Sequence, residues 1–383
     1  MSADYLYIDD PAGLADLCAK LAGKPWLAVD TEFMRERTYY PELCLVQVAT
    51  DELVACIDPL ALKDLKPLLA VLLDPRTVKV LHAARQDLEI FFHMAGKVPA
   101  PVFDTQVAGR FLGLPEQAGY GAAVQSLLGI TLDKSHARTD WARRPISPAA
   151  LDYAADDVRH LRTLYHKIVE ELAARDRTAW AEPELKALTE EKLYRPDPEG
   201  AWHRVRGVQR LKPKIVSLVR PLAAWRERTA MSENRPRQWI LKDEALMDLA
   251  KQLPGNLSAL AAVRGVGESL AKRHGAELLK IIKEGGDGEA PERSPRETPL
   301  KPDQDALVDA LYAILRLKAA KADVSAVSIA SRAELERLVR GERELPLLHD
   351  WRLEMAGREL LEFLEGRHAL SAAEGRLRLT PLN

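Results

Sequence analysis

The stretch Trp26–Phe33 constrains this chain more than any other, because an apolar run there ends in two closely spaced carboxylates. Side chains alternate between the two faces of a strand, so Asp30 and Glu32 project together from the end of a buried strand. A hard divalent cation such as Mg²⁺ relieves the repulsion between two such charges, since it prefers carboxylate oxygens. The alternative is a strand end whose carboxylates are simply solvated, and this stretch alone favours neither interpretation.

Length and composition indicate a soluble globular protein of two or three domains. The chain has 383 residues, of which 47% are hydrophobic and 29% charged. Its three cysteines, Cys18, Cys44 and Cys56, are odd in number and lack CxxC spacing, so a disulfide framework or a zinc site is not indicated. The acidic N-terminus does not resemble a secretory signal, and no apolar run reaches the ~20 residues of a membrane helix. We therefore expect a cytoplasmic protein without membrane contact.

The small net charge of −2 conceals an asymmetry along the chain. Residues 1–200 hold 23 Lys and Arg against 31 Asp and Glu, whereas residues 201–300 hold 19 against 12. Such a division predicts that catalysis and polyanion binding lie in different segments. The basic segment interleaves Trp202, Trp225 and Trp239 with a row of cations, a composition typical of single-strand binding unless the tryptophans are core residues. These cations are Arg204, Arg206, Arg210, Lys212, Lys214, Arg220, Arg226, Arg228, Arg235 and Arg237.

Apolar patterning predicts strands and helices in a mixed order over the first half of the chain. Two apolar runs separated by the short Asp51-Glu52 connection predict a β-hairpin, and later strands alternate with helices. Ser147 followed by Pro148 is a good start for a long helix that should run to about Arg175. Paired strands followed by alternating strands and helices favour a mixed α/β sheet flanked by helices. The expected strands are 26–33, 43–49, 53–57, 78–81 and 101–103, and the expected helices are 11–22, 60–73, 84–94 and 147–175.

The remainder of the chain reads as two helical units separated by breaker-rich stretches. Prolines and glycine interrupt 178–211, and 284–303 has the composition of a linker. The expected organisation is an α/β domain at 1–177, a connector at 178–211, a helical domain at 212–283, a linker at 284–303 and a second helical domain at 304–383.

Two further carboxylates lie at suggestive positions on predicted helices. Asp87 stands early in one helix beside apolar neighbours, although a carboxylate favoured by the helix dipole is the plainer interpretation. Asp157 follows Tyr153 by four residues, so the two side chains share one helix face, a spacing that ordinary packing also produces. Asp152 and Asp156 point elsewhere and are expected to be solvated.

The order of these motifs along the chain identifies a protein group more specifically than any single motif does. Asp-x-Glu on a first strand, an Asp on a later helix and Tyr-x-x-x-Asp on another helix resemble the DEDDy exonucleases. Short sequence motifs around these residues narrow the resemblance to the ribonuclease D family. They are Val-Asp-Thr-Glu-Phe33, Leu-Val-Gln-Val48, His-Ala-Ala-Arg-Gln-Asp87, Phe-Asp-Thr-Gln106 and Asp-Trp-Ala-Arg-Arg-Pro145.

This resemblance implies a ribonuclease-H-like α/β exonuclease domain followed by two all-α HRDC-type domains. It also implies that Asp30, Glu32, Asp87 and Asp157 hold two divalent ions, Mg²⁺ or Mn²⁺, which activate a water and stabilise the leaving oxygen. Tyr153 would orient the attacking water. The implied reaction is 3′→5′ hydrolysis of RNA with release of 5′-mononucleotides, and the implied substrates are tRNA precursors with 3′ extensions.

Several other residues receive smaller roles. Phe33, Gln47 and His82 are candidates for contact with the terminal nucleotide, although packing beside the site is the favoured interpretation of His82. Arg143 and Arg144 are candidates for phosphate binding, with a solvated face as the alternative. Asp104 is interpreted either as a residue that supports the metal ligands or as a helix N-cap, and not as a metal ligand itself.

Two alternative functions stay open at this point. A DNA 3′→5′ exonuclease is one, since DEDDy sites and HRDC domains both occur in DNA enzymes. A nucleic-acid-binding scaffold with a silent site is the other, although all five key residues are present. A monomer is expected.

Overall fold

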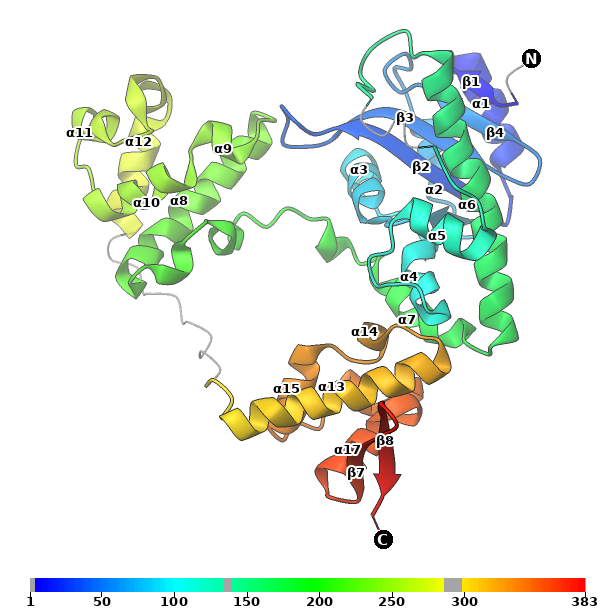
Figure 1. The fold of residues 1–383 in the computed structure, drawn as a ribbon. Helices are drawn as coiled ribbons and strands as arrows, with labels where there is room; N and C mark the ends of the chain where they lie inside the picture. Colours follow the sequence, from blue (N-terminus) through cyan, green and yellow to red (C-terminus); the bar gives the residue numbers. More distant parts are fainter. Residues whose placement is uncertain (1–3, 134–138, 286–297, 383) are drawn as a thin grey trace. The chain divides into compact units, whose positions relative to one another are not determined.

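A computed structural model of the protein describes residues 4–133, 139–285 and 298–382. The chain divides into two compact units (Figure 1). Unit 1 comprises Met1–Glu32, Cys44–Leu193 and Thr298–Asn383, and unit 2 comprises Phe33–Leu43 and Tyr194–Glu297. None of the described helices combines the length and the apolar character needed to cross a bilayer. Most of the predicted linker, residues 286–297, lies outside the described residues.

A six-stranded mixed sheet forms the centre of unit 1, as the sequence predicted. Its strand order is β1-β4-β3-β2-β5-β6, with β3 and β4 antiparallel and the β1–β4, β2–β5 and β5–β6 pairs parallel. The predicted hairpin around Asp51 is confirmed, since Thr50 N–H donates to the Leu53 carbonyl at 2.9 Å. The strands are β1 Leu6–Ile8, β2 Trp26–Met34, β3 Glu42–Ala49, β4 Val54–Ile57, β5 Val78–Leu81 and β6 Val102–Asp104.

Helices cover the sheet because its central strands are apolar on both faces. The long helix α6, drawn in green in Figure 1, packs across β4 and β5. The helix expected at 60–73 begins only at Lys66, because the Asp58 carboxylate first holds a turn through the N–H groups of Leu60 and Ala61. The helices of this part are α1 Pro11–Leu21, α2 Lys66–Leu72, α3 Arg85–Ala95, α4 Thr105–Gly109, α5 Tyr120–Leu128 and α6 Pro148–Ala174.

Residues 178–187, which the sequence analysis placed in the connector, form helix α7 (Thr178–Ala187) of unit 1. Its Ala181 and Leu185 share a hydrophobic core with Phe111. The C-terminal helices dock on this region, since Trp180 stacks on Trp351 with ring centroids 4.6 Å apart. Arg177 also donates to the carbonyls of Phe111 and Ala322. The exonuclease-like part and the C-terminal helical part are therefore one compact body.

The C-terminal part differs from the all-α expectation in one respect. After its helices the chain forms an antiparallel hairpin of β7 (His368–Ala373) and β8 (Arg376–Pro381). Leu370 and Leu379 of the hairpin pack against the helical core. The helices are α13 Pro302–Ala322, α14 Ala326–Ile329, α15 Arg332–Val339, α16 Asp350–Arg352 and α17 Arg358–Leu364.

Unit 2 is helical around the core residue Trp225, which is 2% exposed. One of its predicted RNA-binding cations, Arg226, is instead buried and paired with Asp243 at 2.6 Å. Trp239 is 54% exposed and keeps a free face. The helices are α8 Pro213–Ser232, α9 Arg237–Ile240, α10 Asp243–Gln252, α11 Leu257–Ala262 and α12 Gly267–Gly285.

The segment Phe33–Leu43 belongs to unit 2 although it follows Glu32 directly along the chain. The Tyr39 hydroxyl donates to the buried Glu227 carboxylate at 2.6 Å. The Asn234 side-chain oxygen accepts from the N–H groups of Tyr39 and Tyr40, both at 3.1 Å. The chain therefore passes from unit 1 to unit 2 directly after Glu32, and the segment that follows Asp30 and Glu32 packs within the helical unit.

Candidate metal centre

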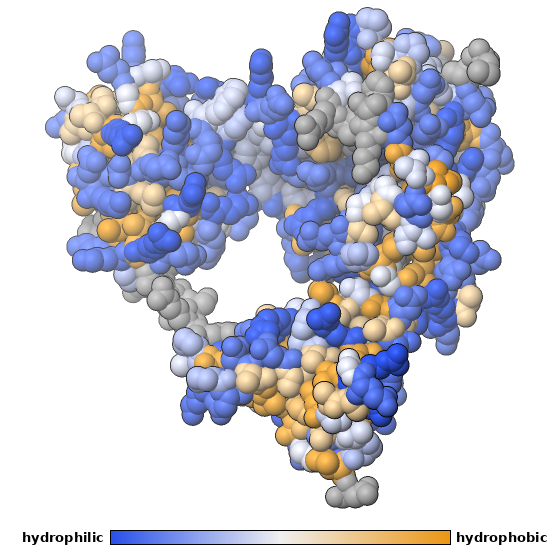
Figure 2. Space-filling model, viewed as in Figure 1, coloured by the Kyte–Doolittle hydropathy of each residue, from blue (hydrophilic) through white to orange (hydrophobic). Residues whose placement is uncertain are grey.

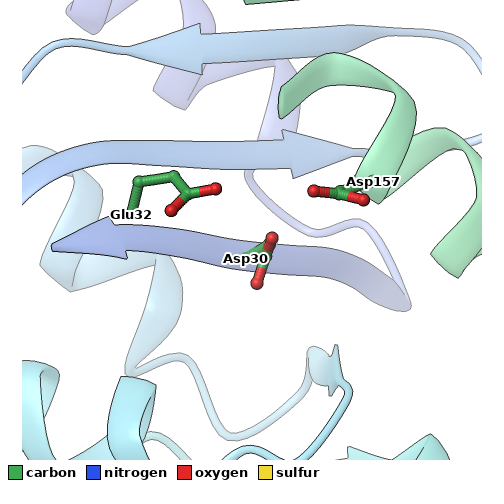
Figure 3. A group of neighbouring side chains, drawn as sticks. All are labelled: Asp30, Glu32 and Asp157. Carbon is green, nitrogen blue, oxygen red and sulfur yellow. The ribbon is translucent and has the colours of Figure 1, made fainter. Parts of the chain in front are cut away.

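Strand β2 places Asp30 and Glu32 on one face, as side-chain alternation predicted. Figure 3 shows Asp30 and Glu32 side by side along β2, with Asp157 approaching from helix α6. One oxygen of each lies within 4.8 Å of the others, and all three side chains are half-buried. Three carboxylates from two elements distant in sequence therefore converge on one point.

Helix α6 carries Asp157 to this point through a well-defined start. The Ser147 hydroxyl accepts from the N–H of Ala150 at 3.2 Å, and Pro148 occupies the first turn, which confirms the predicted N-cap. At the site itself, the Tyr120 hydroxyl donates to the backbone carbonyl of Asp157. This bond ties the helix backbone to α5 at the level of the metal centre.

Asp87 lies beside the group but is held differently. It is 7% exposed on the first turn of α3, at the edge of the buried face where the sequence placed it. The Thr31 hydroxyl, on the opposite face of β2 from Asp30, donates to the Asp87 carboxylate. Asp87 is outside the set of oxygens that lie within 4.8 Å, so the structure gathers three of the four predicted ligands and places the fourth next to them.

Asp104 fixes the start of the helix that carries Asp87. Its carboxylate accepts from the N–H groups of Ala83 at 3.0 Å and Ala84 at 2.9 Å, and from Gln106 at 2.8 Å. Ala83 adopts a left-handed conformation (φ 54°), which costs free energy for a non-glycine residue and persists here because Asp104 holds it. The interpretation of Asp104 as a helix N-cap is confirmed at α4.

Burial and the negative charge of nearby carboxylates raise the pKa of all four carboxyl groups. The pKa of Glu32 rises to about 9, first through burial and then through the three neighbouring carboxylates. Burial is also the largest cause of the raised pKa values of Asp30, Asp87 and Asp157. Among the described residues no lysine or arginine pairs with this group. An all-oxygen donor set with uncompensated negative charge fits a hard divalent cation.

Tyr153 stands one helical turn before Asp157 and donates its hydroxyl hydrogen bond to that carboxylate. Burial, followed by the charge of Asp157, raises the pKa of Tyr153, so the phenol remains a donor at neutral pH. The bond in turn lowers the pKa of Asp157, against the effect of burial. The predicted pairing of these two residues on one helix face is therefore present.

A cavity of about 310 Å³ opens beside Tyr153 and Asp157. Asp133, Asp152 and Asp156 also line it. Asp152 and Asp156 are exposed, as expected, and do not belong to the metal-binding group. The acidic lining repels a polyanion, so a phosphate gains access to this place only where cations compensate the charge.

The two arginines predicted to bind phosphate occupy different environments. Arg144 forms a bidentate ion pair with the buried Asp58, at 2.6 and 2.7 Å, and also donates to the Cys44 carbonyl. A phosphate would have to compete with these bonds, so the geometry favours a structural role for Arg144. Arg143 is exposed, and among the described residues its side chain has no carboxylate partner.

The three candidates for nucleotide contact are placed as follows. Gln47 is fully buried on β3, so in this conformation it has no surface to offer a nucleotide. His82 has both ring nitrogens engaged, with Thr105 and the Ala118 carbonyl each 2.9 Å away, and burial lowers its pKa. These contacts favour the packing role for His82. Phe33 is half-buried at the end of β2.

Thr31 and Tyr120 are the site residues that the sequence analysis missed. Thr31 lies between the two carboxylates of β2, where alternation assigns it to the other face, and nothing in sequence indicates that Asp87 approaches there. Tyr120 follows Gly119 in a stretch without helical periodicity long enough to predict α5. A single tyrosine after such a segment gives no indication in the sequence that it belongs to the site.

Comparison with known proteins relates this geometry to well-defined families. Residues 5–173 match the family described as 3'-5' exonuclease, and residues 217–282 match the HRDC domain. Ribonuclease D of Sphingobium indicum is 41% identical over 387 residues, which cover 97% of this chain and 98% of that protein. Ribonuclease D of Zymomonas mobilis is 41% identical over 380 residues and 97% of each chain.

A solved structure agrees with these sequence matches. The crystal structure of Escherichia coli RNase D, described as an exoribonuclease involved in structured RNA processing, superposes with a TM-score of 0.77. Sequence identity is 32%, and the match covers 94% of this chain and 99% of that chain. The similarity therefore spans the α/β part and the helical parts together.

Proposed function

Because the chain belongs to the ribonuclease D family and is a 3′→5′ exoribonuclease, we propose that it uses two divalent cations, Mg²⁺ or Mn²⁺. The observation that carries this proposal is the gathering of carboxylate oxygens of Asp30, Glu32 and Asp157 within 4.8 Å. Asp87 completes the donor set from α3. When bound, such cations lower the pKa of a water and offset charge on the leaving oxygen.

The surrounding residues hold this donor set in place. Thr31 keeps the Asp87 carboxylate oriented toward β2, and Tyr120 fixes the Asp157 backbone. The Tyr153 hydroxyl, a protonated donor beside Asp157, orients the attacking water. These residues position the reacting groups and add no metal ligand.

We propose precursor tRNAs with 3′ extensions as the physiological substrate and the cytoplasm as the compartment. The relationship to an Escherichia coli enzyme of structured RNA processing supports a folded RNA as substrate. The three cysteines are free and buried, which suits a reducing compartment. A monomer suffices for the reaction, since all proposed ligands come from one chain.

The direct test uses RNA and DNA oligomers labelled at the 5′ end, with Mg²⁺, with Mn²⁺ or with EDTA. We expect a ladder of RNA products shortened from the 3′ end, release of 5′-mononucleotides, and no products in EDTA. Faster degradation of DNA than of RNA would support the DNA exonuclease alternative. Binding without degradation under every metal condition would support a silent scaffold.

Tyr153→Phe is expected to reduce kcat by about 10- to 100-fold while leaving cation affinity nearly unchanged, because it removes a water-positioning hydroxyl and no ligand. Loss of the hydrogen bond to Asp157 also raises the pKa of that carboxyl group. The rising limb of the pH–rate profile should therefore move to higher pH. Stopped-assay kinetics across pH and Mn²⁺ titration by calorimetry measure both effects. Normal turnover together with lost Mn²⁺ affinity would show that Tyr153 is misassigned.

The structure narrows the predicted RNA-binding surface of unit 2. Arg226 and Arg228 pair with Asp243 and Glu199, and further cations of the basic segment pair with Glu227 or Glu233. Of the ten cations named above for the basic segment, five are exposed and have no carboxylate partner among the described residues, so they remain available for phosphate. They are Arg206, Arg210, Lys212, Lys214 and Arg220.

Replacing Lys212, Lys214 and Arg220 together by alanine is expected to weaken binding of a tRNA precursor and to make its salt dependence shallower. Each phosphate contact on a single strand contributes roughly −0.7 to the slope of log K against log salt, so three lost contacts change the slope by about 2. Filter binding across a salt series measures this slope, and hydrolysis of a short oligomer should remain normal.

Arg228→Ala is the matched control, since Arg228 is paired with Glu199 at 2.6 Å. Equal slopes for the triple variant and the wild type would show that Lys212, Lys214 and Arg220 do not contact phosphate. Point variants are preferable to truncation because Phe33–Leu43, next to the metal strand in sequence, packs within the same unit.

A further inference from the structure

A groove of about 490 Å³ runs between helix α13 and the C-terminal hairpin, away from the metal centre residues. All six residues of β8, Arg376–Pro381, line it, whereas β7 contributes only His368. The groove therefore follows the length of β8. Ile314 and Leu317 of α13 form its opposite wall. The C-terminal part of the chain lies at the bottom of Figure 2, where apolar surface (orange) and strongly hydrophilic surface (blue) adjoin each other.

The backbone of β8 offers an unpaired edge to this groove. The hairpin has two strands, so each strand has one edge without a neighbour. Leu382 N–H donates to the Arg367 carbonyl at 2.8 Å, so these two residues, which face each other, form a hydrogen-bonded pair of the hairpin. Hydrogen-bonded and non-hydrogen-bonded pairs alternate along an antiparallel ladder, so Leu377 and Leu379 belong to non-hydrogen-bonded pairs. Their N–H and C=O groups therefore turn away from β7. Leu377 is also 39% exposed.

The groove is positively charged. Its lining includes Lys318, Lys321, Arg376 and Arg378 against a single carboxylate, Glu359. Glu359 is already paired with Lys318 at 2.6 Å, and Arg378 pairs with an exposed residue outside the lining. Among the described residues, Lys321 and Arg376 have no carboxylate partner. An occupant with acidic side chains complements this charge.

We propose that this groove binds an extended acidic segment of a partner protein, which adds to β8 as a third strand. Main-chain hydrogen bonds to Leu377 and Leu379 supply the affinity. Side chains on the two faces of the added strand alternate, as they do on β8. Residues beside Leu377 and Leu379 are therefore apolar, and those beside Arg376 and Arg378 are acidic. The partner segment is thus an alternating apolar and acidic sequence.

The composition of the groove favours a peptide over a nucleic acid. No phenylalanine, tyrosine or tryptophan lines it in the described part of the chain, whereas single-strand sites stack bases on such rings. A β edge, in contrast, matches the hydrogen-bond spacing of an extended polypeptide. This surface is separate from the cations of unit 2 and does not depend on the metal centre.

The test measures binding of fluorescein-labelled Glu-Val-Glu-Val-Glu-Val-Glu peptide to the full-length protein by anisotropy. Saturable binding that weakens with salt is expected, and the matched peptide with lysine in place of glutamate should not bind. On binding, the amides of Leu377 and Leu379 should become protected from hydrogen exchange. Absence of saturable binding, or equal binding of the lysine peptide, overturns the proposal.

Two variants separate the contributions of charge and backbone. Arg376→Glu is expected to weaken peptide binding by about fivefold or more, as reversal of an exposed charge contact allows. Leu377→Pro removes an outward N–H without touching the ladder and should weaken binding by a similar factor. Arg358→Glu, outside the lining, is the charge-matched control and should bind normally. All three variants should hydrolyse a short RNA oligomer at the wild-type rate.

Two outcomes would assign the groove to another occupant. Displacement of the peptide by an oligouridine, with loss of oligouridine binding in Arg376→Glu, would make it a nucleic-acid site and overturn the proposal. Wild-type protein that sediments as a dimer, with a monomeric Leu377→Pro variant, would show that a second copy occupies the edge. Unchanged peptide affinity in both Arg376→Glu and Leu377→Pro would contradict the proposed geometry outright.

Discussion

Asp30→Asn is expected to lower kcat by roughly a thousandfold or more while the protein stays folded, because members of one catalytic unit lose function together. Asparagine keeps the size of the side chain but replaces an anionic ligand with a neutral one. In the structure Asp30 shares its site with Glu32 and Asp157 within 4.8 Å, so one lost charge weakens cation binding by the whole group. Single-turnover hydrolysis of an end-labelled RNA at saturating Mn²⁺ measures the effect.

Asp156→Asn provides the matched control for this series. Asp156 adjoins Asp157 in sequence, but its exposed side chain pairs with Arg159 at 2.6 Å and lies outside the metal-binding group. We expect its turnover within about threefold of wild type, whereas Asp157→Asn should resemble Asp30→Asn. Near-normal turnover in folded Asp30→Asn protein would remove the basis of the two-cation proposal.

The carboxylates could be predicted from sequence because strand and helix periodicities are local. A two-residue spacing on a strand places Asp30 and Glu32 together, and a four-residue spacing on a helix places Tyr153 over Asp157. The contact between these two pairs depends on the tertiary structure. At the level of sequence, only the family resemblance predicts it. The exact state of Asp87 could not be predicted, since its hydrogen bond from Thr31 depends on how α3 packs on the sheet.

The missed elements share a physical cause, which is that local signals were weak or contrary. Pro183 suggested a break, yet it lies inside α7, which tertiary packing stabilises despite the lost backbone bond. The C-terminal hairpin turns at Glu374 and Gly375, both with positive φ, and Glu is a poorer signal there than Asn or Asp. Its first strand, His368–Ala373, is rich in alanine, which is depleted in strands.

Long-range contacts made by single polar residues could not be predicted from sequence at all. Asn234 accepts two N–H groups from a segment nearly two hundred residues earlier in the chain. From sequence, Arg144 is a candidate for phosphate binding or for a solvated face, and neither interpretation includes the buried Asp58 carboxylate with which it pairs. A sequence reveals charge and spacing, whereas the partner of each charge is decided by the fold.

Metal-free protein is expected to lose stability as the pH rises from about 4 to 9, and divalent cations are expected to restore it. The folded-state pKa values of the site carboxyl groups lie well above the value of about 4 that unfolded chains show. At pH values between the unfolded pKa and the raised folded pKa values, the native state therefore binds more protons than the unfolded state. Stability then falls with increasing pH, since its slope follows the difference in bound protons.

Below about pH 4 the groups are protonated in both states and their contribution is fully present. It is lost as the pH passes through the raised folded values, which reach about 9 at Glu32. A bound cation replaces the protons, so its stabilising effect should grow with pH, and its binding at pH 7 should release protons. Calorimetry in buffers of different ionisation enthalpy measures that release.

Comparison of wild type with Asp30→Asn in EDTA isolates the carboxylates from other titrating groups. Burial also lowers the pKa of Lys79 from 10.5 to about 8, which acts in the opposite direction above about pH 8, but this contribution is common to both proteins. Because asparagine cannot ionise, the variant should show a flatter pH dependence and should melt about 3 °C or more above wild type at pH 9. Parallel melting curves for the two proteins from pH 6 to 9 would mean that Asp30 ionises normally, and that burial and repulsion at this site do not favour cation binding.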